Sequence, residues 1–255
     1  MMWKVIQASV VGTSHTDLDQ PCQDYCNADV IRGADDLSYL VCVVSDGAGR
    51  AKEGGKGAEL ACVTAMSRIK ADLGNLRLYQ LDEALIEEWV KDIRSAIYET
   101  AEVSGLTARD YACTLLGAVV GPNKTAFFQI GDGAIVASNG CTQGIVFWPD
   151  SGRYANMTYF VTEEDAIAHL HVSVTSAYID EIALFSDGIQ RLALSFEQRT
   201  PHTPFFEPML KVLRKCGLDE CETFDEQLSR FLNSPQINER TDDDKTLVIA
   251  TRRTP

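Results

Sequence analysis

Several apolar, strand-like segments of this 255-residue chain run directly into aspartate. Three of them end in Asp-Gly, and a fourth site is a run of aspartates; the positions are Asp46-Gly47, Asp132-Gly133, Asp187-Gly188 and Asp242-Asp243-Asp244. A carboxylate at a strand end is held by a rigid scaffold yet faces solvent, and the following glycine lets the backbone turn sharply. One such pair alone is typical of a simple turn. The repetition favours a shared site, and hard cations such as Mg²⁺ and Mn²⁺ choose oxygen ligands of this kind.

Short segments rich in β-branched or aromatic residues predict strands at 39–45, 112–120, 124–130, 158–162, 171–175, 181–186 and 246–251, and residues 1–11 are similar. Two helices are expected at 56–72 and 81–103. The second carries apolar residues at four-residue spacing, from Leu81 to Ile97, which indicates a core-facing stripe. Because the strands come in runs and the helices in clumps, we expect one α+β domain over 1–255 with largely antiparallel sheets.

A helical region is also expected before the last strand. Pro208 is a candidate first-turn residue of one helix, and Thr223 with Glu226 forms a candidate capping box for the next. No repeat, low-complexity tract or linker interrupts the chain.

The formal net charge of −14 argues against a nucleic-acid partner, because 23 basic residues are scattered among 37 acidic ones. The N-terminal segment has no signal-peptide pattern, and no apolar run reaches the roughly 18 residues of a membrane span. We therefore expect a cytoplasmic protein that does not bind membranes. An acidic protein that handles phosphorylated substrates would use cations to reverse its local field.

The eight cysteines are Cys22, Cys26, Cys42, Cys62, Cys113, Cys141, Cys216 and Cys221. Most lie in apolar segments, where a free thiol packs as a small hydrophobic group, so reduced thiols are expected instead of a disulfide framework. A zinc site is disfavoured, because no CxxC pair or nearby histidine at finger spacing is present.

Taken in order, the motifs resemble those of the PP2C family of metal-dependent protein phosphatases, from about residue 8 to residue 250. The matching segments are Gly12-Thr-Ser-His15 with Pro21-Cys-Gln-Asp24, Ser45-Asp46-Gly47-Ala48-Gly49, Ala112-Cys113-Thr114-Leu115-Leu116, Gln129-Ile-Gly-Asp132-Gly133, Ser186-Asp187-Gly188 and Asp243-Asp244-Lys245-Thr246. The chain looks most like a short bacterial variant often encoded beside a protein kinase and a von Willebrand factor A protein, including the segment Tyr154-Ala-Asn-Met-Thr-Tyr-Phe160.

The resemblance implies a four-layer α-β-β-α sandwich and a site for two Mn²⁺ or Mg²⁺ ions. Asp46 would bridge them, with the Gly47 carbonyl on one ion and Asp187 and Asp243 on the other. Asp24 would act through metal-bound waters in the second shell. Asp132, with Asp187, would hold a weaker third ion.

The implied reaction is hydrolysis of phosphoserine and phosphothreonine in proteins by a metal-bridging hydroxide, without a phosphoenzyme. In agreement with this, no cysteine is followed by Arg at the sixth position within a Gly-rich turn, as a phosphatase with a cysteine nucleophile would require. The resemblance also suggests a cognate Ser/Thr kinase and a von Willebrand factor A protein as partners. The acidic composition predicts basic residues near the phosphosite of the substrate.

Two departures from the family pattern weaken the expectation of fast turnover. Ala48 stands where a proton-donating His is common, and Asp19 where a phosphate-binding Arg is common. His15 is a candidate donor to the phosphate or the leaving group, and a structural role is its alternative. Arg50 is a weaker phosphate-binding candidate, and an exposed loop cation is its default interpretation. His169 and His171 are expected to be structural.

Two other functional classes remain open. A binding module with the PP2C fold, which recognises phosphorylated partners without hydrolysing them, is favoured by the two departures and disfavoured by the full set of aspartates. A haloacid-dehalogenase-type phosphatase would need Asp-x-Asp-x-Thr/Val after a first strand, and that motif follows no predicted strand. An EF-hand interpretation of the Asp run fails for want of its alternating ligands and terminal Glu.

Overall fold

Two five-stranded sheets face each other and helices cover both outer faces, in a computed structural model that describes residues 2–75, 81–149, 158–217 and 220–254. All strand pairings in both sheets are antiparallel. The first sheet has the order β1 (Lys4–Val10), β12 (Lys245–Thr251), β9 (Glu181–Phe185), β6 (Ala134–Ser138) and β7 (Gln143–Ile145). The second has the order β2 (Asp24–Arg32), β3 (Ser38–Asp46), β4 (Leu115–Val120), β5 (Thr125–Ile130) and β8 (His171–Thr175). The predicted α+β class with two antiparallel sheets and flanking helices is confirmed.

The central strands are apolar on both faces, because each sheet packs against the other sheet on one face and against helices on the other. β4 and β5 are buried along their whole length. One core lies between the two sheets and includes Leu116, Phe127, Leu184 and Val248. One further core lies between each sheet and the helices that cover it. Removing this apolar surface from water is the main force that holds the four layers together.

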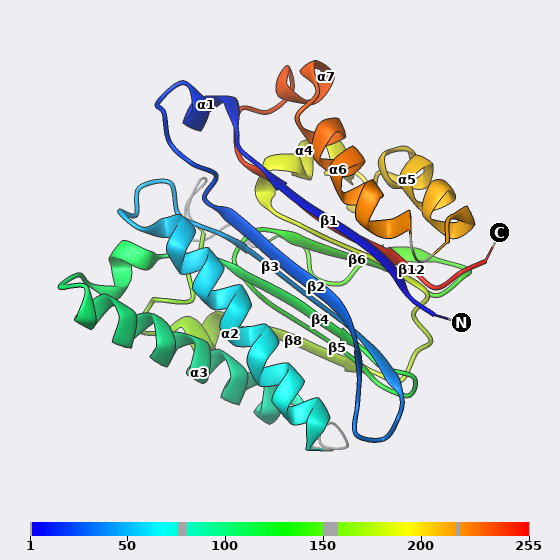
Figure 1. Ribbon diagram of the computed structural model, residues 1–255, viewed down its shortest axis with the longest axis horizontal. Helices are drawn as coiled ribbons and strands as arrows, with labels where there is room; N and C mark the ends of the chain where they lie inside the picture. Colours follow the sequence, from blue (N-terminus) through cyan, green and yellow to red (C-terminus); the bar gives the residue numbers. More distant parts are fainter. Residues whose placement is uncertain (1, 76–80, 150–157, 218–219, 255) are drawn as a thin grey trace.

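Helices α2 (Gly54–Gly74) and α3 (Glu83–Val103) cover the second sheet (Figure 1). The predicted stripe of α3 faces the core, since Leu85, Trp89, Ile93 and Ile97 are buried. The Asp82 side chain caps the helix by accepting a hydrogen bond from the Leu85 N–H at 3.0 Å. Both predicted helices are therefore present, within two residues of the expected bounds of each.

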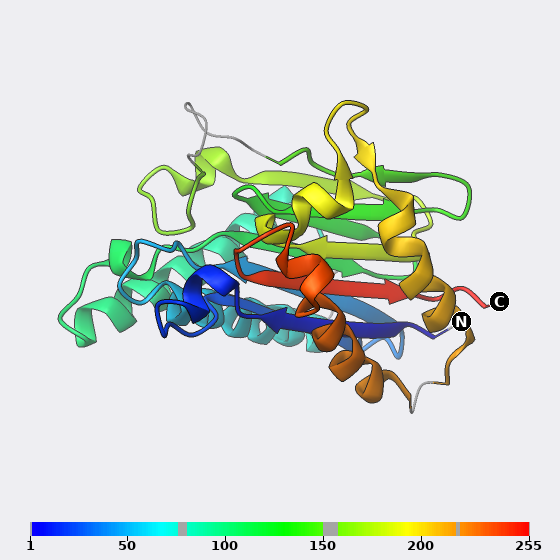
Figure 2. The same ribbon diagram turned by 90° about the horizontal axis from the view of Figure 1, so that it is seen from above.

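A second helical layer covers the first sheet, so that the strands lie between α2 and α6 (Figure 2). It contains α4 (Gln190–Ala193), α5 (Thr203–Lys215), α6 (Cys221–Leu232) and α7 (Pro235–Asn238), while α1 (Thr13–Thr16) follows β1. Two predicted helix starts are wrong. Pro208 lies inside α5, which begins at Thr203. Thr223 lies inside α6 and donates to the Glu220 carbonyl at 2.6 Å, so it forms no capping box.

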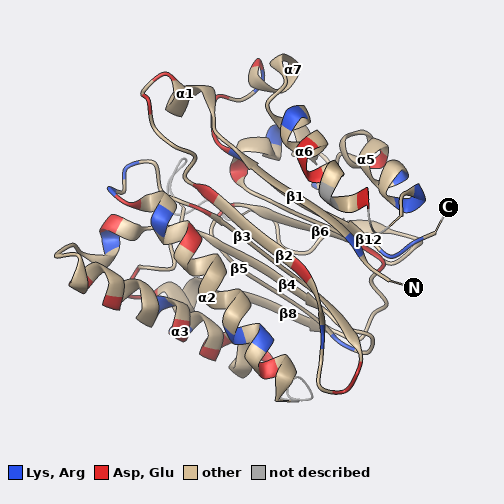
Figure 3. Cartoon of the chain, viewed as in Figure 1, with Lys and Arg blue, Asp and Glu red and all other residues tan. Residues whose placement is uncertain are grey.

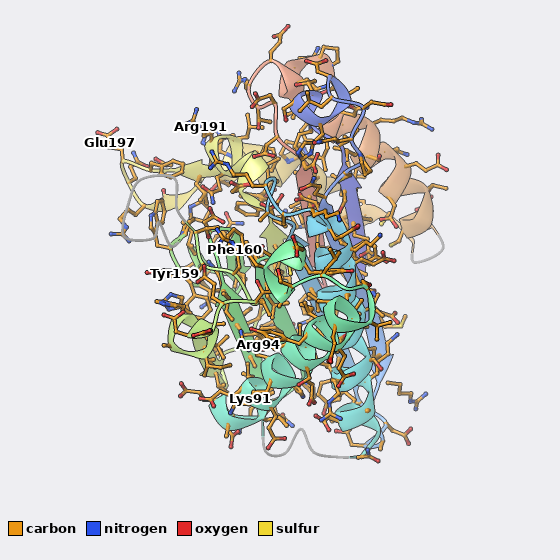
Figure 4. The ribbon with its side chains drawn as sticks, turned by 90° about the vertical axis from the view of Figure 1, so that its left-hand side faces the viewer. Lys91, Arg94, Tyr159, Phe160, Arg191 and Glu197 are labelled. Atoms are coloured by element: carbon orange, nitrogen blue, oxygen red, sulfur yellow. The ribbon has the colours of Figure 1, made fainter. Side chains whose placement is uncertain are left out.

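The strand predicted at 158–162 is not present, because this segment enters a turn that is bound to α3. The carbonyls of Val161 and Glu163 accept hydrogen bonds from Arg94, and the Thr162 carbonyl accepts one from Tyr98 at 2.9 Å. Figure 4 labels Arg94 on α3, and Tyr159 and Phe160 in the segment that leads into this turn. Three consecutive carbonyls bound to side chains of one helix cannot also pair with a strand. Residues 154–157 of the predicted family segment lie outside the described residues.

Short elements complete the chain: β10 (Leu194–Ser195), β11 (Thr200–Pro201) and the 3₁₀ turns η2 (Ala108–Tyr111), η3 (Ala166–His169) and η4 (Asp187–Ile189). In the part of the chain that the structure describes, no helix combines the length and apolar character needed to cross a membrane.

Candidate active site

The predicted aspartates come together because their strands begin or end at the same edge of the sandwich. β2 begins at Asp24 and β3 ends at Asp46, and the two residues are directly opposite in the antiparallel register. In the other sheet the end of β9 pairs with the start of β12, which brings Asp187 near Asp243. Figure 3 shows acidic positions gathered at this end, beneath α1. Two sheets therefore contribute to one acidic site.

Ser186 joins the two halves of the site. Its hydroxyl donates to Oδ2 of Asp24 at 2.6 Å, and it accepts from the Thr246 N–H at 3.1 Å. Asp24 is only 6% exposed, and its Oδ1 is buried without a hydrogen-bond partner. A buried carboxylate oxygen without a donor is costly, so this atom marks a place for a ligand.

The turn after Asp46 is fixed by close backbone contacts. The Asp46 N–H donates to the Thr114 hydroxyl at 3.0 Å, and the Thr114 N–H donates to the Asp46 carbonyl at 2.8 Å. A Cβ on Gly47 would lie 2.3 Å from the carbonyl carbon of Gly54, and one on Gly188 would lie 1.8 Å from the Asp244 carbonyl oxygen. Glycine is thus required at both positions, which explains two of the Asp-Gly pairs.

The acidic side chains raise one another's pKa values. Burial raises the pKa of Asp24 from 3.8 to about 7, and burial together with the charges of Asp132 and Asp243 raises the pKa of Asp187 to about 7. The pKa of Asp46 is raised well above its usual range by burial and by the charges of Asp24, Asp187 and Asp243. Burial also raises the pKa of Asp243. The carboxylates therefore repel one another in their ionised forms.

Asp132 lies in the turn between β5 and β6, where the chain crosses from one sheet to the other. The Gln190 side chain donates to its backbone carbonyl. The charge of Asp132 is the largest electrostatic influence on the pKa of Asp187. Asp132 therefore lies near Asp187.

Asp244 is a structural centre that the sequence analysis did not single out. It is 2% exposed, and its carboxylate accepts from the Gly12 N–H at 2.6 Å and from the Gln23 N–H at 2.5 Å. His15 Nδ1 lies 2.9 Å from Oδ2 of Asp244, within ion-pair distance but not aligned as a hydrogen bond. These contacts hold the first motif against the last. The sequence offered only one signal, the position of Asp244 beside Asp243.

The other polar residues singled out from the sequence differ in whether they lie at the site. His15 sits at the site with a side chain 12% exposed, whereas Arg50 is an exposed loop cation. Asp19 is exposed in a left-handed turn with φ of 54°. The structural role expected of His169 is supported, since its ring stacks on Tyr159 with ring centres 3.5 Å apart. The His171 ring lies 5.6 Å from that of Phe147.

The carboxylates fit hard divalent cations. Among the described residues, no group of three or more His, Cys, Asp or Glu side chains is placed to hold a metal ion as they stand. Mg²⁺ and Mn²⁺ do not require one, since such ions keep several waters and take one or two carboxylates. The buried Asp24 Oδ1 and the mutual repulsion of the aspartates are the features that a cation would relieve.

Residues 11–233 match the family profile described as protein phosphatase 2C. The chain belongs to this family. The predicted resemblance is therefore confirmed, and with it the class of protein phosphatase. The PP2C chain is also 41% identical over 250 residues to Serine/threonine-protein phosphatase 3 of Escherichia coli K12, with 98% of each chain covered.

Solved structures of low sequence identity share the PP2C fold. A bacterial serine phosphatase has a TM-score of 0.65 at 15% identity, covering 100% of this chain and 99% of that one. The catalytic domain of PstP, in complex with 2 manganese ions, has a TM-score of 0.61 at 16% identity, covering 98% and 97% of the two chains. Phosphatase Stp1 of Staphylococcus aureus gives 0.61 at 14% identity, covering 98% and 95%.

Proposed function

We propose that this PP2C protein is a metal-dependent phosphatase that hydrolyses phosphoserine and phosphothreonine in proteins. The observation that carries the proposal is the cluster of buried, mutually repelling aspartates with an unpartnered oxygen on Asp24. The Serine/threonine-protein phosphatase 3 of Escherichia coli supports the substrate class, and the manganese ions of the PstP structure support the cofactor.

Asp46, the Gly47 carbonyl, Asp187 and Asp243 are the proposed ligands of two Mn²⁺ or Mg²⁺ ions. Asp24 would act through water, and Asp132 with Asp187 would take a weaker third ion. When bound, the cations supply electrophilic activation of water and of the phosphoryl group. Ser186 fixes the orientation of the Asp24 carboxylate through its 2.6 Å hydrogen bond to Oδ2, which leaves Oδ1 for a metal-bound water.

Water attacks phosphorus directly in this proposal, and the bond from phosphorus to the seryl or threonyl oxygen breaks. The leaving oxygen then needs a proton. Ala48 has no proton to give, so His15 is the candidate donor. Its Nδ1 faces Asp244, and its Nε2 would donate the proton. The proposed substrates are phosphorylated cytoplasmic proteins. A cognate kinase and a von Willebrand factor A protein are proposed partners on family resemblance alone.

The test is phosphate release from a phosphothreonine peptide with and without millimolar Mn²⁺. We expect release that depends on the metal and that falls by about a thousandfold or more in Asp46→Asn and in Asp187→Asn, since several kcal/mol of charge stabilisation are lost. Asp29→Asn, a substitution of an exposed aspartate on β2, is the matched control.

A wild-type protein that folds and binds Mn²⁺ but releases no phosphate would overturn the proposal. It would favour a module that binds phosphorylated partners, the alternative to which Ala48 and Asp19 point.

A further inference from the structure

A small pocket lies between α4, α5 and α7. Its volume is about 180 Å³, with Leu192, Phe205 and Ile237 among its apolar lining residues and His202 and Arg240 among its polar ones. Leu192 and Ile237 are 8% and 6% exposed, whereas His202 and Arg240 are exposed. The pocket therefore has an apolar floor and a cationic rim.

The pocket is close to the aspartate site, because two of its lining residues are only a few residues from site aspartates in the sequence. Leu192 follows Asp187 by five residues of 3₁₀ and α-helix, a rise of about 8–10 Å. Arg240 precedes Asp243 by three residues, which span about 10 Å at most. Figure 1 shows α4 and α7 at the same end of the sandwich as α1. A peptide held at the site by its phosphorylated residue would reach the pocket with a side chain two or three residues away, at about 3.3–3.6 Å per residue.

The lining determines which side chain fits. The pocket is smaller than the roughly 300–1,000 Å³ of sites for drug-sized ligands, so it suits a single side chain. Phe205 is held in place by Phe206 and Phe231, with ring centres 5.1 and 6.1 Å away. No Asp or Glu is among the described residues that line it, in a chain with 37 acidic residues. A basic side chain would meet the Arg240 cation and find no acidic partner among these residues.

We propose that this pocket binds a bulky apolar side chain of the phosphoprotein substrate, two or three residues from the phosphorylated residue. The inference rests on the proposed phosphatase activity and adds a specificity site to it. At this one position it replaces the general preference for basic residues that the acidic composition predicted.

The experiment uses phosphothreonine peptides with an alanine background and a single Leu, Ala or Lys placed at each position from three before to three after the phosphothreonine. At one position two or three residues away, Leu should raise kcat/KM about tenfold over Ala, mainly through KM, because an apolar pocket discriminates by about this factor. Lys at that position should be poorer than Ala.

Three variants tie the preference to the pocket. Gln236→Trp places a large ring on the pocket wall, so the Leu to Ala ratio should fall to near one. Gln227→Trp makes the same exchange at an exposed position of α6 that does not line the pocket, and should keep the ratio. Arg240→Glu reverses a rim charge and should raise kcat/KM for the Lys peptide relative to Ala.

The outcomes separate this inference from the activity on which it rests. Equal hydrolysis of Leu, Ala and Lys peptides at every position, or a Leu preference that survives Gln236→Trp, overturns the pocket. If no peptide is hydrolysed in Mn²⁺, the proposed phosphatase activity itself fails.

Discussion

Asp244 and Asp24 are both buried, at 2% and 6% exposure, but their surroundings differ. Both oxygens of Asp244 accept backbone N–H groups, from Gly12 and Gln23. Asp24 has Ser186 on one oxygen and no partner on the other. A buried carboxylate whose oxygens are satisfied holds the chain together, whereas one left with a free oxygen is placed for a ligand.

The difference assigns separate tasks to neighbouring residues. Asp243 and Asp244 adjoin in sequence, yet Asp243 is exposed toward the site and Asp244 points into the protein. Asp244 thereby locks the segment before Asp24 to the segment that carries Asp243. The ligand geometry depends on a carboxylate that need not touch the cations.

Asp244→Asn should give the largest effect on stability. The exchange removes a charge and places an amide NH₂ where a backbone N–H needs an acceptor, so unfolding free energy should fall by about 1–3 kcal/mol even without metal. Urea unfolding of the metal-free protein measures this. Asp242→Asn, at an exposed neighbour, is the matched control and should leave the midpoint unchanged. If Asp244→Asn is as stable as this control, Asp244 is not a structural carboxylate that differs in kind from Asp24.

A gradual effect, spread over several pH units, is expected from pH. Since the pKa values of Asp24 and Asp187 rise from 3.8 to about 7 on folding, the native protein binds more protons than the unfolded chain between about pH 4 and 7. Unfolding free energy of the metal-free protein should therefore decrease as pH rises through this window, by at most about 1.4 kcal/mol per pH unit for each proton.

Urea midpoints between pH 4.5 and 7.5 in a chelator test this slope. Asp187→Asn should flatten it, and saturating Mn²⁺ should oppose it because the cation favours the ionised carboxylates. Stability that increases with pH over the same range, in wild type and variant alike, would show that the aspartates do not repel one another in the folded protein.

The sequence indicated which aspartates lie together better than it indicated the scaffold around them. Asp46, Asp132 and Asp187 stand out because apolar strands run straight into Asp-Gly. β2 was missed because its apolar residues do not alternate with polar ones, and only Asp24 and Ala28 are buried in it. Asp24 was reached through family resemblance alone. The strand at 158–162 was predicted wrongly, since the hydrogen bonds from Arg94 and Tyr98 come from a helix some 60 residues earlier in the chain.

Other features need three-dimensional information of the same kind. The sequence Asp243-Asp244 does not indicate which of the two carboxylates is buried. The N–H donors that Asp244 binds, Gly12 and Gln23, lie more than 200 residues earlier in the chain. The pocket between α4, α5 and α7 likewise joins residues with no local pattern. Local chemistry could be predicted, whereas long-range partners could not.

Calorimetric titration of Mn²⁺ into the metal-free protein at pH 7 tests the aspartate site most directly. Run in two buffers of different ionisation enthalpy, it also counts the protons released. The wild type should bind Mn²⁺ with release of protons from the aspartates of raised pKa, and Asp46→Asn should bind at least about a hundredfold more weakly. Equal affinity and equal proton release in the two proteins would contradict a cation site built on these aspartates.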